Sequence, residues 1–335
     1  MSKRIGKNTI IFENAPIISS AASVVGKKEG EGPLGHLFDK TYQDDTFGKD
    51  SWEKSESFLQ KEAVSLAIEK REICESDIDL IFAGDLLNQC VGAHYGLRDM
   101  RVPFFGLFGA CSTFIEGMML ASLSVDSGAS KRSLCVTSSH FCSAEKQFRQ
   151  PLDYGGQRTP SAQWTVTGAG ACILEKGTGI SVLSATPGRI VDMGISDPSN
   201  MGIAMAPAAC DTLTSLFNDT NTVPDDYDLI LTGDLGYFGS DMLRDLTKKN
   251  GFNITKNYND AGCMIFDRIK QDVHGGGSGC GCIASVFCAD ILPRLKSGEY
   301  RKIIVMATGA LMNTQAINQG ETIPSVAHAV ILKGV

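Results

Sequence analysis

The octapeptide DLIFAGDL at residues 79–86 recurs as DLILTGDL at residues 228–235, and six of the eight positions are identical. Short apolar or β-branched runs alternate with helical patterns around both copies, which is typical of a layered α/β fold. Each copy is followed by a helix that opens at a Gly- and Cys-containing segment, and then by two further strands. Elements that recur in one order indicate a duplicated chain, because chance similarity would be confined to one peptide.

The duplication predicts how the chain is organised. We expect similar halves at residues 1–180 and 181–335. Since neither half covers both faces of its own sheet, the halves should stack as a five-layered α/β/α/β/α fold with a pocket where they meet. We expect strands at residues 78–83, 134–138, 171–174, 229–232, 303–307 and 329–332, and helices at residues 57–70, 112–127, 240–249 and 283–297.

Composition excludes several classes of protein. With 335 residues, 43% of them hydrophobic, the chain can bury a large core. Its net charge of −7, without a long Lys or Arg run, argues against a nucleic acid partner. The eleven cysteines are odd in number and lie in apolar segments, which indicates a reducing compartment. No signal peptide or apolar run of membrane-spanning length is present, so we expect any membrane contact to run through a partner or the surface.

Cys111 stands in the segment FGACSTFIEGMMLAS, after a Gly-Ala turn and before Ser112 and Thr113. We expect it at a helix N-terminus, where the dipole and free amides favour a thiolate. A thiolate there would be a nucleophile. The alternative is a small buried residue that packs at the start of the helix.

These features resemble the thiolase and ketoacyl synthase superfamily. Within it, the segments GPLGHLFDKTY, AGDLLNQ, FGACST, TSSH, EKQFR, MAPAA, DYDLILTGDL, GGSGC, MATGAL and ETIP together resemble the SpoVAD family of spore proteins, over essentially the whole chain. The resemblance implies a protein that binds dipicolinic acid, or its calcium salt, and acts with the other SpoVA proteins in loading and releasing that acid. It also implies a peripheral place at the spore inner membrane and a homodimer that joins the central sheets.

The resemblance to condensing enzymes implies a second-half His, with an Asn or a further Cys or His, to handle protons and hold the thioester oxygen. This chain reads LTGDLGYFG at the first of these places, with Asp234 and Gly236, and HGGGSGCGC at the second. Because no imidazole stands in either motif, we predict a non-enzymatic binding protein. The alternative is an acyltransferase with Cys111 as nucleophile and an unrecognised base such as His140.

The other histidines and cysteines have simpler interpretations. We expect His274 to anchor a loop and His328 to be a satisfied core residue, whereas His140 follows a strand end where ligands of open α/β sheets bind. Cys280 and Cys282 lack the spacing of a structural zinc site, so we predict no metal, and we predict no cofactor. The segment GGGSGCG could hold an anion through its amides without nucleotide specificity.

Dipicolinate is a flat pyridine with two carboxylates, so it needs donors at two places with an apolar slot between them. The Cys111 helix start and the loop at residues 276–281 should offer amides across the interface of the halves. Arg149 and Arg158, in a segment read as a long loop, offer guanidinium groups, and Phe105, Phe108 and Met205 are candidate apolar walls. The predicted ligand-binding residues are Cys111, Ser112, Ser139, His140, Arg149, Asp234, Gly277, Ser278 and Gly309.

Overall fold

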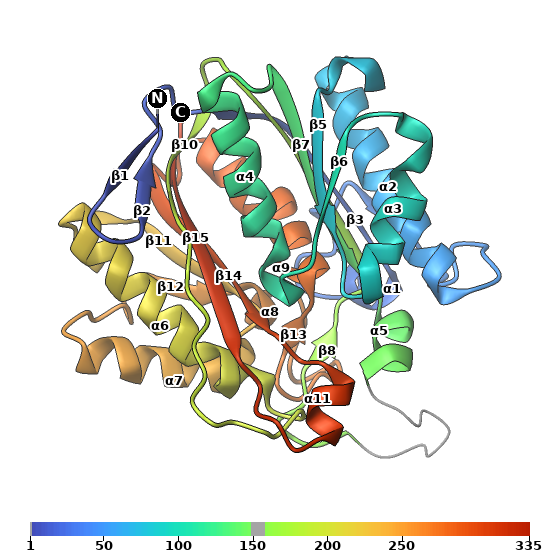
Figure 1. The fold of residues 1–335 in the computed structure, drawn as a ribbon. Helices are drawn as coiled ribbons and strands as arrows, with labels where there is room; N and C mark the ends of the chain where they lie inside the picture. The colour runs from blue at the N-terminus through green and yellow to red at the C-terminus, as the bar shows by residue number, and fades with distance from the viewer. Residues whose placement is uncertain (1, 149–157) are drawn as a thin grey trace.

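The first half of the chain forms a mixed sheet. The computed structural model describes residues 2–148 and 158–335, and Figure 1 shows its path. Neighbouring strands are antiparallel for the first two pairings and parallel for the next two. The order across this sheet is β3 (Ile17–Val25), β9 (Gly168–Glu175), β7 (Arg132–Ser139), β5 (Leu80–Gly84) and β6 (Phe104–Leu107).

The second half repeats this order and these directions. Its strands are β10 (Ile180–Thr186), β15 (Ser325–Lys333), β14 (Lys302–Ala310), β11 (Leu229–Gly233) and β12 (Tyr258–Asp260). The two octapeptides therefore contribute β5 and β11, which hold equivalent positions. A short antiparallel ladder between β10 and β3 joins the two sheets. The predicted duplicated α/β fold is confirmed, while the boundary between residues 180 and 181 stays a prediction.

Helices and sheets alternate in five layers. The first sheet is covered on its outer face by α2 (Trp52–Arg71) and α3 (Val91–Leu97), and the second by α6 (Met201–Thr220) and α7 (Gly236–Lys249). Between the sheets lie α4 (Thr113–Ser127) and α9 (Cys280–Val286), which contact strands of both halves. Figure 1 shows α4 and α9 flanked by β7 and β14.

The central helix α4 is apolar on most of its surface because it packs against both sheets. Phe114, Ile115 and Met118 are fully buried, and α4 ends at Gly128, whose φ of 80° suits glycine. Helix α2 instead faces solvent on one side, and its start is capped by the Ser51 hydroxyl, which accepts a bond from the Lys54 amide. The sequence patterns thus follow the layer that each helix occupies.

The predicted elements are all present with shifted ends. The predicted helix at residues 283–297 is observed as α9, a π-helical turn (Phe287–Ile291) and α10 (Leu292–Lys296). The predicted long loop is wrong in its first part, because α5 (Phe141–Phe148) occupies it. The remaining elements are β1 (Lys3–Ile5), β2 (Thr9–Ile11), α1 (Lys27–Gly30), β4 (Lys40–Thr41), β8 (Trp164–Thr165), α8 (Ala261–Met264), β13 (Gly277–Ser278), α11 (Thr314–Asn318) and short 3-10 turns.

Candidate functional site

Cys111 lies where the chain turns from β6 into the central helix. Ala110 has a φ of 53°, and Cys111 is 7% exposed in the 3-10 turn that leads into α4. The Ser112 hydroxyl donates to the Gly109 carbonyl at 2.7 Å, and the Thr113 hydroxyl donates to the Ala110 carbonyl at 2.6 Å. These side chains hold the turn and fix the thiol between the two halves.

Gly309, on β14 of the second half, allows this turn to approach the sheet. A Cβ atom at Gly309 would lie 2.3 Å from the Gly109 carbonyl oxygen and 3.2 Å from the Ser112 amide nitrogen. Only a residue without a side chain fits this distance from the backbone. The structure therefore brings the predicted residues Ser112 and Gly309 together beside Cys111.

Asp234 is the second-half residue that faces this region. It follows β11 directly, has a φ of 77° and is fully buried. Within the described part of the chain, neither of its carboxyl oxygens has a hydrogen bond of full geometry, although the Gly279 amide and the Cys282 thiol lie close enough to act on its pKa. Burial, and then the Asp260 carboxyl, raise the pKa of Asp234 well above its ordinary value, while the Gly279 amide and the Cys282 thiol limit the rise. Burial thus favours the protonated form of the Asp234 carboxyl.

The Cys111 thiol is also neutral. Burial raises the pKa of Cys111 well above its ordinary value, and the Asp234 carboxyl adds to the shift. The amides of Gly279 and of Cys111 itself oppose this rise without cancelling it. The expected thiolate is therefore wrong, because the loss of hydration on burial outweighs the amides at the helix start.

The second-half glycine loop is built into the fold more tightly than expected. Its strand β13, which contains Gly277 and Ser278, pairs with β8. The Gly275 and Gly276 amides donate to backbone carbonyls, at 2.9 and 3.0 Å. The Gly281 amide donates to the Ser139 hydroxyl at 3.1 Å, and that hydroxyl donates to the Val166 carbonyl at 2.7 Å. Since these amides are used internally, Gly279, whose amide interacts with both Cys111 and Asp234, is the donor that faces the site.

Acidic residues from the first half complete the site. Cys280 packs with Leu86, Cys111 and Ala144. Burial raises the pKa of the Cys280 thiol, and the nearby ionisable groups of Cys111, Asp85 and Glu56 raise it further. The Glu56 carboxyl is bonded to the hydroxyls of Ser143 at 2.5 Å and Ser138 at 3.2 Å. Burial raises the pKa of Glu56, and its neighbour Asp85 adds to the shift.

Sequence reasoning missed Glu56 and Asp85 as site residues. Asp85 could have been found, because it occupies the same place in the first octapeptide as Asp234 does in the second. Glu56 carried no such signal, since an acidic residue in the first turns of an amphipathic helix is ordinary on a solvated face.

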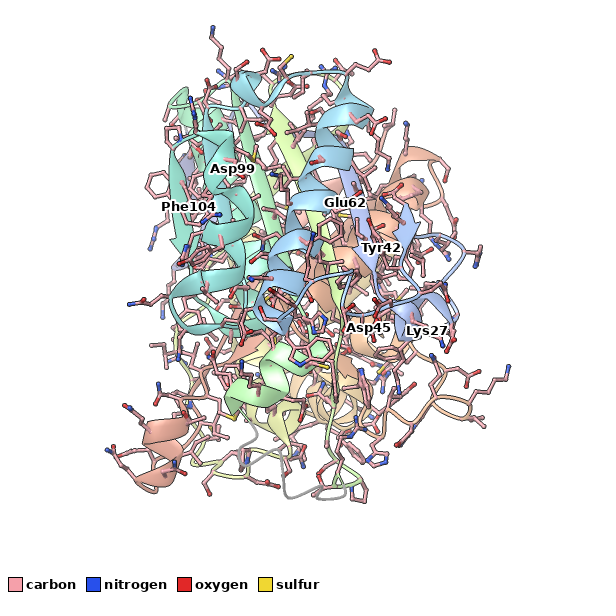
Figure 2. The ribbon with its side chains drawn as sticks, turned by 90° about the vertical axis from the view of Figure 1, so that its right-hand side faces the viewer. Lys27, Tyr42, Asp45, Glu62, Asp99 and Phe104 are labelled. Carbon is pink, nitrogen blue, oxygen red and sulfur yellow. The ribbon has the colours of Figure 1, made fainter. Side chains whose placement is uncertain are left out.

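His140 does not share the bonds of this site. Its ring is buried, its Nε2–H donates to the Asp45 carbonyl at 2.8 Å, and its Nδ1 accepts from the Cys142 amide at 3.1 Å. Asp45 is labelled in Figure 2 on the loop below α2. Burial lowers the pKa of His140, so the ring is a neutral structural group that ties α5 to this loop.

Several other expected residues lie elsewhere. Arg149 is outside the described residues. Phe105 and Phe108 are 51% and 54% exposed, so their assignment as apolar walls is wrong, and Met205 is buried in the layer between α6 and the second sheet. His274 anchors its loop by donating to the Thr159 carbonyl at 2.7 Å, and the His328 Nδ1 accepts from the Gly188 amide.

A pocket of 740 Å³ lies beside the apolar cluster that contains Cys111, because Phe148 packs against that cluster and also lines the pocket. Leu87, Ser143 and Lys146 line it as well, together with residues of α11. Among the described residues, no three His, Cys, Asp or Glu side chains are placed to hold a metal ion together. The site is thus a set of buried thiols, carboxyls and amides, with a pocket of mixed polar and apolar lining nearby.

Known proteins are similar to this chain over almost its whole length. The family model described as Stage V sporulation protein AD (SpoVAD) matches residues 6–333. The chain belongs to the SpoVAD family. It is 46% identical over 332 residues to Stage V sporulation protein AD of Bacillus subtilis (strain 168), covering 99% of this chain and 98% of the relative. No helix in the described residues is both long and apolar enough to cross a bilayer.

Solved structures of condensing enzymes share the fold of this SpoVAD-family chain. The 3-oxoacyl-[acyl-carrier-protein] synthase III of Aquifex aeolicus aligns with a TM-score of 0.58 at 12% identity, over 95% of this chain and 99% of that one. A variant of OleA from Xanthomonas campestris aligns with a TM-score of 0.62 at 14% identity, over 96% and 99% of the two chains. At this identity the likeness concerns the fold alone.

Proposed function

We propose that this SpoVAD-family protein is a non-enzymatic binding protein for dipicolinic acid in the bacterial spore. It takes the acid, free or as its calcium salt, at the Cys111 site and supports its uptake in sporulation and its release in germination. It works with the other SpoVA proteins, which hold it peripherally at the inner membrane. Family membership supports the spore role, and the chemistry of the site supports binding over catalysis.

The observation that carries the proposal is the buried Asp234 carboxyl near Cys111. A condensing reaction needs a thiolate, a proton-transferring imidazole and donors for the developing oxyanion. Here burial raises the pKa of the Cys111 thiol well above its ordinary value, and the His140 ring is bonded to the Asp45 loop. A thiol in this state is a poor nucleophile.

Neutral carboxyl groups suit the binding of a dicarboxylate. A protonated carboxyl donates a hydrogen bond that an ionised one cannot donate. The protonated Asp234 carboxyl forms no hydrogen bond of full geometry in the described chain, so its proton is available to a ligand carboxylate, and the nearby Gly279 amide is a second donor. Charge-assisted hydrogen bonds of about 1.5 to 3 kcal/mol each would give binding between roughly micromolar and millimolar.

Calorimetry with dipicolinate tests the site. Cys111→Trp should abolish binding by filling the space beside Asp234, and Cys111→Ala should weaken it less because the Gly279 amide remains. Cys74→Trp is the matched control, since Cys74 is an exposed thiol. If folded Cys111→Trp binds dipicolinate as well as wild type does, the ligand does not use this site.

Incubation with acetyl-CoA and malonyl thioesters tests the catalytic alternative. We expect no turnover, and intact mass should show no stable acylation. Acylation that disappears in Cys111→Ser, with turnover at ordinary enzyme rates, would replace the binding function by acyl transfer.

The edge of the first sheet supports a homodimer. In the described chain β6 pairs with β5 on one side and with no strand on the other. Phe104, Phe105 and Phe108 are exposed there, and Figure 2 shows Phe104 at the outer edge of the molecule. An unpaired apolar edge strand favours pairing with a second copy of the chain.

Light scattering across a concentration series tests the dimer. Phe105→Glu should shift the protein to the mass of a monomer, while Val223→Glu, at an exposed valine elsewhere, should not. A wild-type monomer at all concentrations would contradict the homodimer.

A further inference from the structure

A basic pocket opens on the surface beside the glycine loop of the second half. It has a volume of 780 Å³. Four of its lining residues carry or accept positive charge, namely Arg158, Arg268, Lys270 and His274; the others are Pro160, Phe238, Ile269, Gln271, Asp272 and Val273. On a chain with a net charge of −7, this concentration of basic groups is local.

Aromatic rings hold the two arginines of the basic pocket. The Arg268 guanidinium lies 4.2 Å from the centre of the Tyr237 ring, and the Arg158 guanidinium lies 4.6 Å from the centre of the Trp164 ring. Trp164 is itself fixed by stacking on Phe141 at 3.9 Å. An arginine stacked on a ring loses less side-chain freedom when it binds an anion, because its fork is already oriented.

Lys28 adds a further cation to this region. Its Nζ lies 3.6 Å from the centre of the same Trp164 ring, and both Lys28 and Arg158 donate to the Asp272 backbone carbonyl. Burial, and then the charge of Arg158, lower the pKa of Lys28. The two cations therefore repel each other, and a bound anion would relieve that repulsion.

Two nearby carboxylates pair with basic residues of the pocket itself. Burial lowers the pKa of Lys28, and the carboxylates of Asp272, Glu29 and Glu31 act against this by raising it. The Asp272 carboxylate pairs with the His274 ring at 2.7 Å. Asp267 accepts bonds from the Ile269 and Lys270 amides and lies 3.5 Å from the Lys270 ammonium. No carboxylate of the described residues forms an ion pair with Arg268. The Arg268 guanidinium is thus the cation of the basic pocket that is best placed to pair with an anion.

We propose that the basic pocket binds a small dianion that carries carboxylate or phosphate groups. Arginine forks match both groups with two parallel hydrogen bonds. The apolar side chains of Phe238, Pro160 and the 95% exposed Ile269 favour a ring-bearing dicarboxylate over an inorganic phosphate. That this dicarboxylate is dipicolinate rests on the proposed function. The basic pocket would then bind dipicolinate at the surface, at a place separate from the Cys111 site.

Calorimetry with two probes, dipicolinate and pyrophosphate, tests the basic pocket. The double variant Arg268→Ala and Lys270→Ala should weaken binding of the preferred dianion by about tenfold to a hundredfold. Both side chains are exposed, so the fold should tolerate their loss. The matched control is Lys248→Ala with Lys249→Ala, two exposed residues at the end of α7, which removes the same charge and should bind as wild type does.

Comparison of the probes identifies the anion. If dipicolinate binds more tightly than pyrophosphate, the ligand of the basic pocket is a dicarboxylate. If pyrophosphate binds more tightly, the pocket binds phosphate dianions and the dicarboxylate is rejected. The basic pocket is overturned if neither probe binds, if the double variant binds as wild type does, or if the control weakens binding equally.

The variant Cys111→Trp separates this inference from the proposed function. If dipicolinate binding is lost in Cys111→Trp and unchanged in the double variant, the Cys111 site stands and the basic pocket falls. If the double variant loses binding and Cys111→Trp retains it, the basic pocket stands and the Cys111 site falls. Loss in both indicates that the anion uses both places.

Discussion

Asp85 and Asp234 occupy the same position in the two copies of the octapeptide, yet their surroundings differ. The Asp85 carboxyl accepts from the Leu87 amide at 2.8 Å and from the Ala93 amide at 2.7 Å, so it holds the turn that follows its own strand. Neither oxygen of Asp234 has a hydrogen-bond partner in the described chain. One copy is structural and the other faces the Cys111 site.

The difference has a local cause on the neighbouring strand. In the second half Thr232 lies in register with Asp260, whereas in the first half the equivalent Ala83 lies in register with Gly106. Asp260 accepts bonds from the Thr232 hydroxyl and from the Leu235 and Gly236 amides. Because Asp260 accepts the hydrogen bonds of this turn, the Asp234 carboxyl is not needed to hold it. Duplicated sequence has therefore produced two different chemical environments.

The largest effect on stability should come from removing the Asp260 carboxylate. Asp260→Ala leaves the Thr232 hydroxyl and the amides of Leu235, Gly236 and Gly262 without their acceptor. We expect the free energy of unfolding to fall by about 3 to 5 kcal/mol, measured by urea denaturation. Asp225→Ala, at an exposed carboxylate, should change it little. A small effect at Asp260 would mean that Asp234 can take over these donors.

The same substitution in both copies should have opposite effects. Asp85→Asn places an amide group against a backbone N–H and should cost about 2 kcal/mol of unfolding free energy. Asp234→Asn removes an acid without partners while keeping a residue that tolerates positive φ, so at pH 7 it should be neutral or stabilise by about 1 kcal/mol. Urea denaturation of the two variants measures both values. Equal losses would show that the two carboxyls have equivalent structural roles.

The effect at Asp234 should depend on pH in a defined direction. Its folded pKa lies above the unfolded value of 3.8, so the stability that the acid contributes is fully present below about pH 4 and is lost as pH rises. The gain from Asp234→Asn should therefore disappear near pH 4 and grow toward pH 7. Urea denaturation of wild type and variant between pH 4 and pH 7 tests this direction. An ion-paired Asp, whose folded pKa is lowered, would give the opposite dependence, with a loss from the Asn variant that grows toward pH 7.

The smallest effect should be on the reactivity of Cys111. The ionised form of Asp234 contributes to the raised pKa of Cys111, so at pH 8, where ionisation is favoured most, Asp234→Asn should speed alkylation of that thiol by iodoacetamide by about threefold. Peptide mass spectrometry follows Cys111 separately from the other cysteines. Asp85→Asn is the control, because Asp85 contributes to the raised pKa of Cys280 and not of Cys111. Equal rates for Asp234→Asn and wild type would place Asp234 too far from the thiol to act on it.

The sequence by itself determined the duplication, the element types and the position of Cys111 at the start of a buried helix. These follow from patterns that are local along the chain, such as the octapeptide, the apolar periodicity and the Gly-Ala turn. The absence of a second-half imidazole beside Asp234 was also readable, because the motif that would contain it is contiguous.

Only the tertiary structure decided the protonation and bonding of the site. The neutral Cys111 thiol results from burial between the two halves, and the His140 ring forms a hydrogen bond with the Asp45 carbonyl. Asp260, 26 residues after Asp234, accepts the hydrogen bond of the Gly236 amide in place of Asp234. The basic pocket likewise combines Arg158 and Arg268 from distant segments, and Lys28 lies near it, over the same Trp164 ring as Arg158. Phe105 and Phe108 point outward because β6 is the edge of its sheet. Desolvation and charge depend on which segments meet in space, and spacing along the chain does not record that.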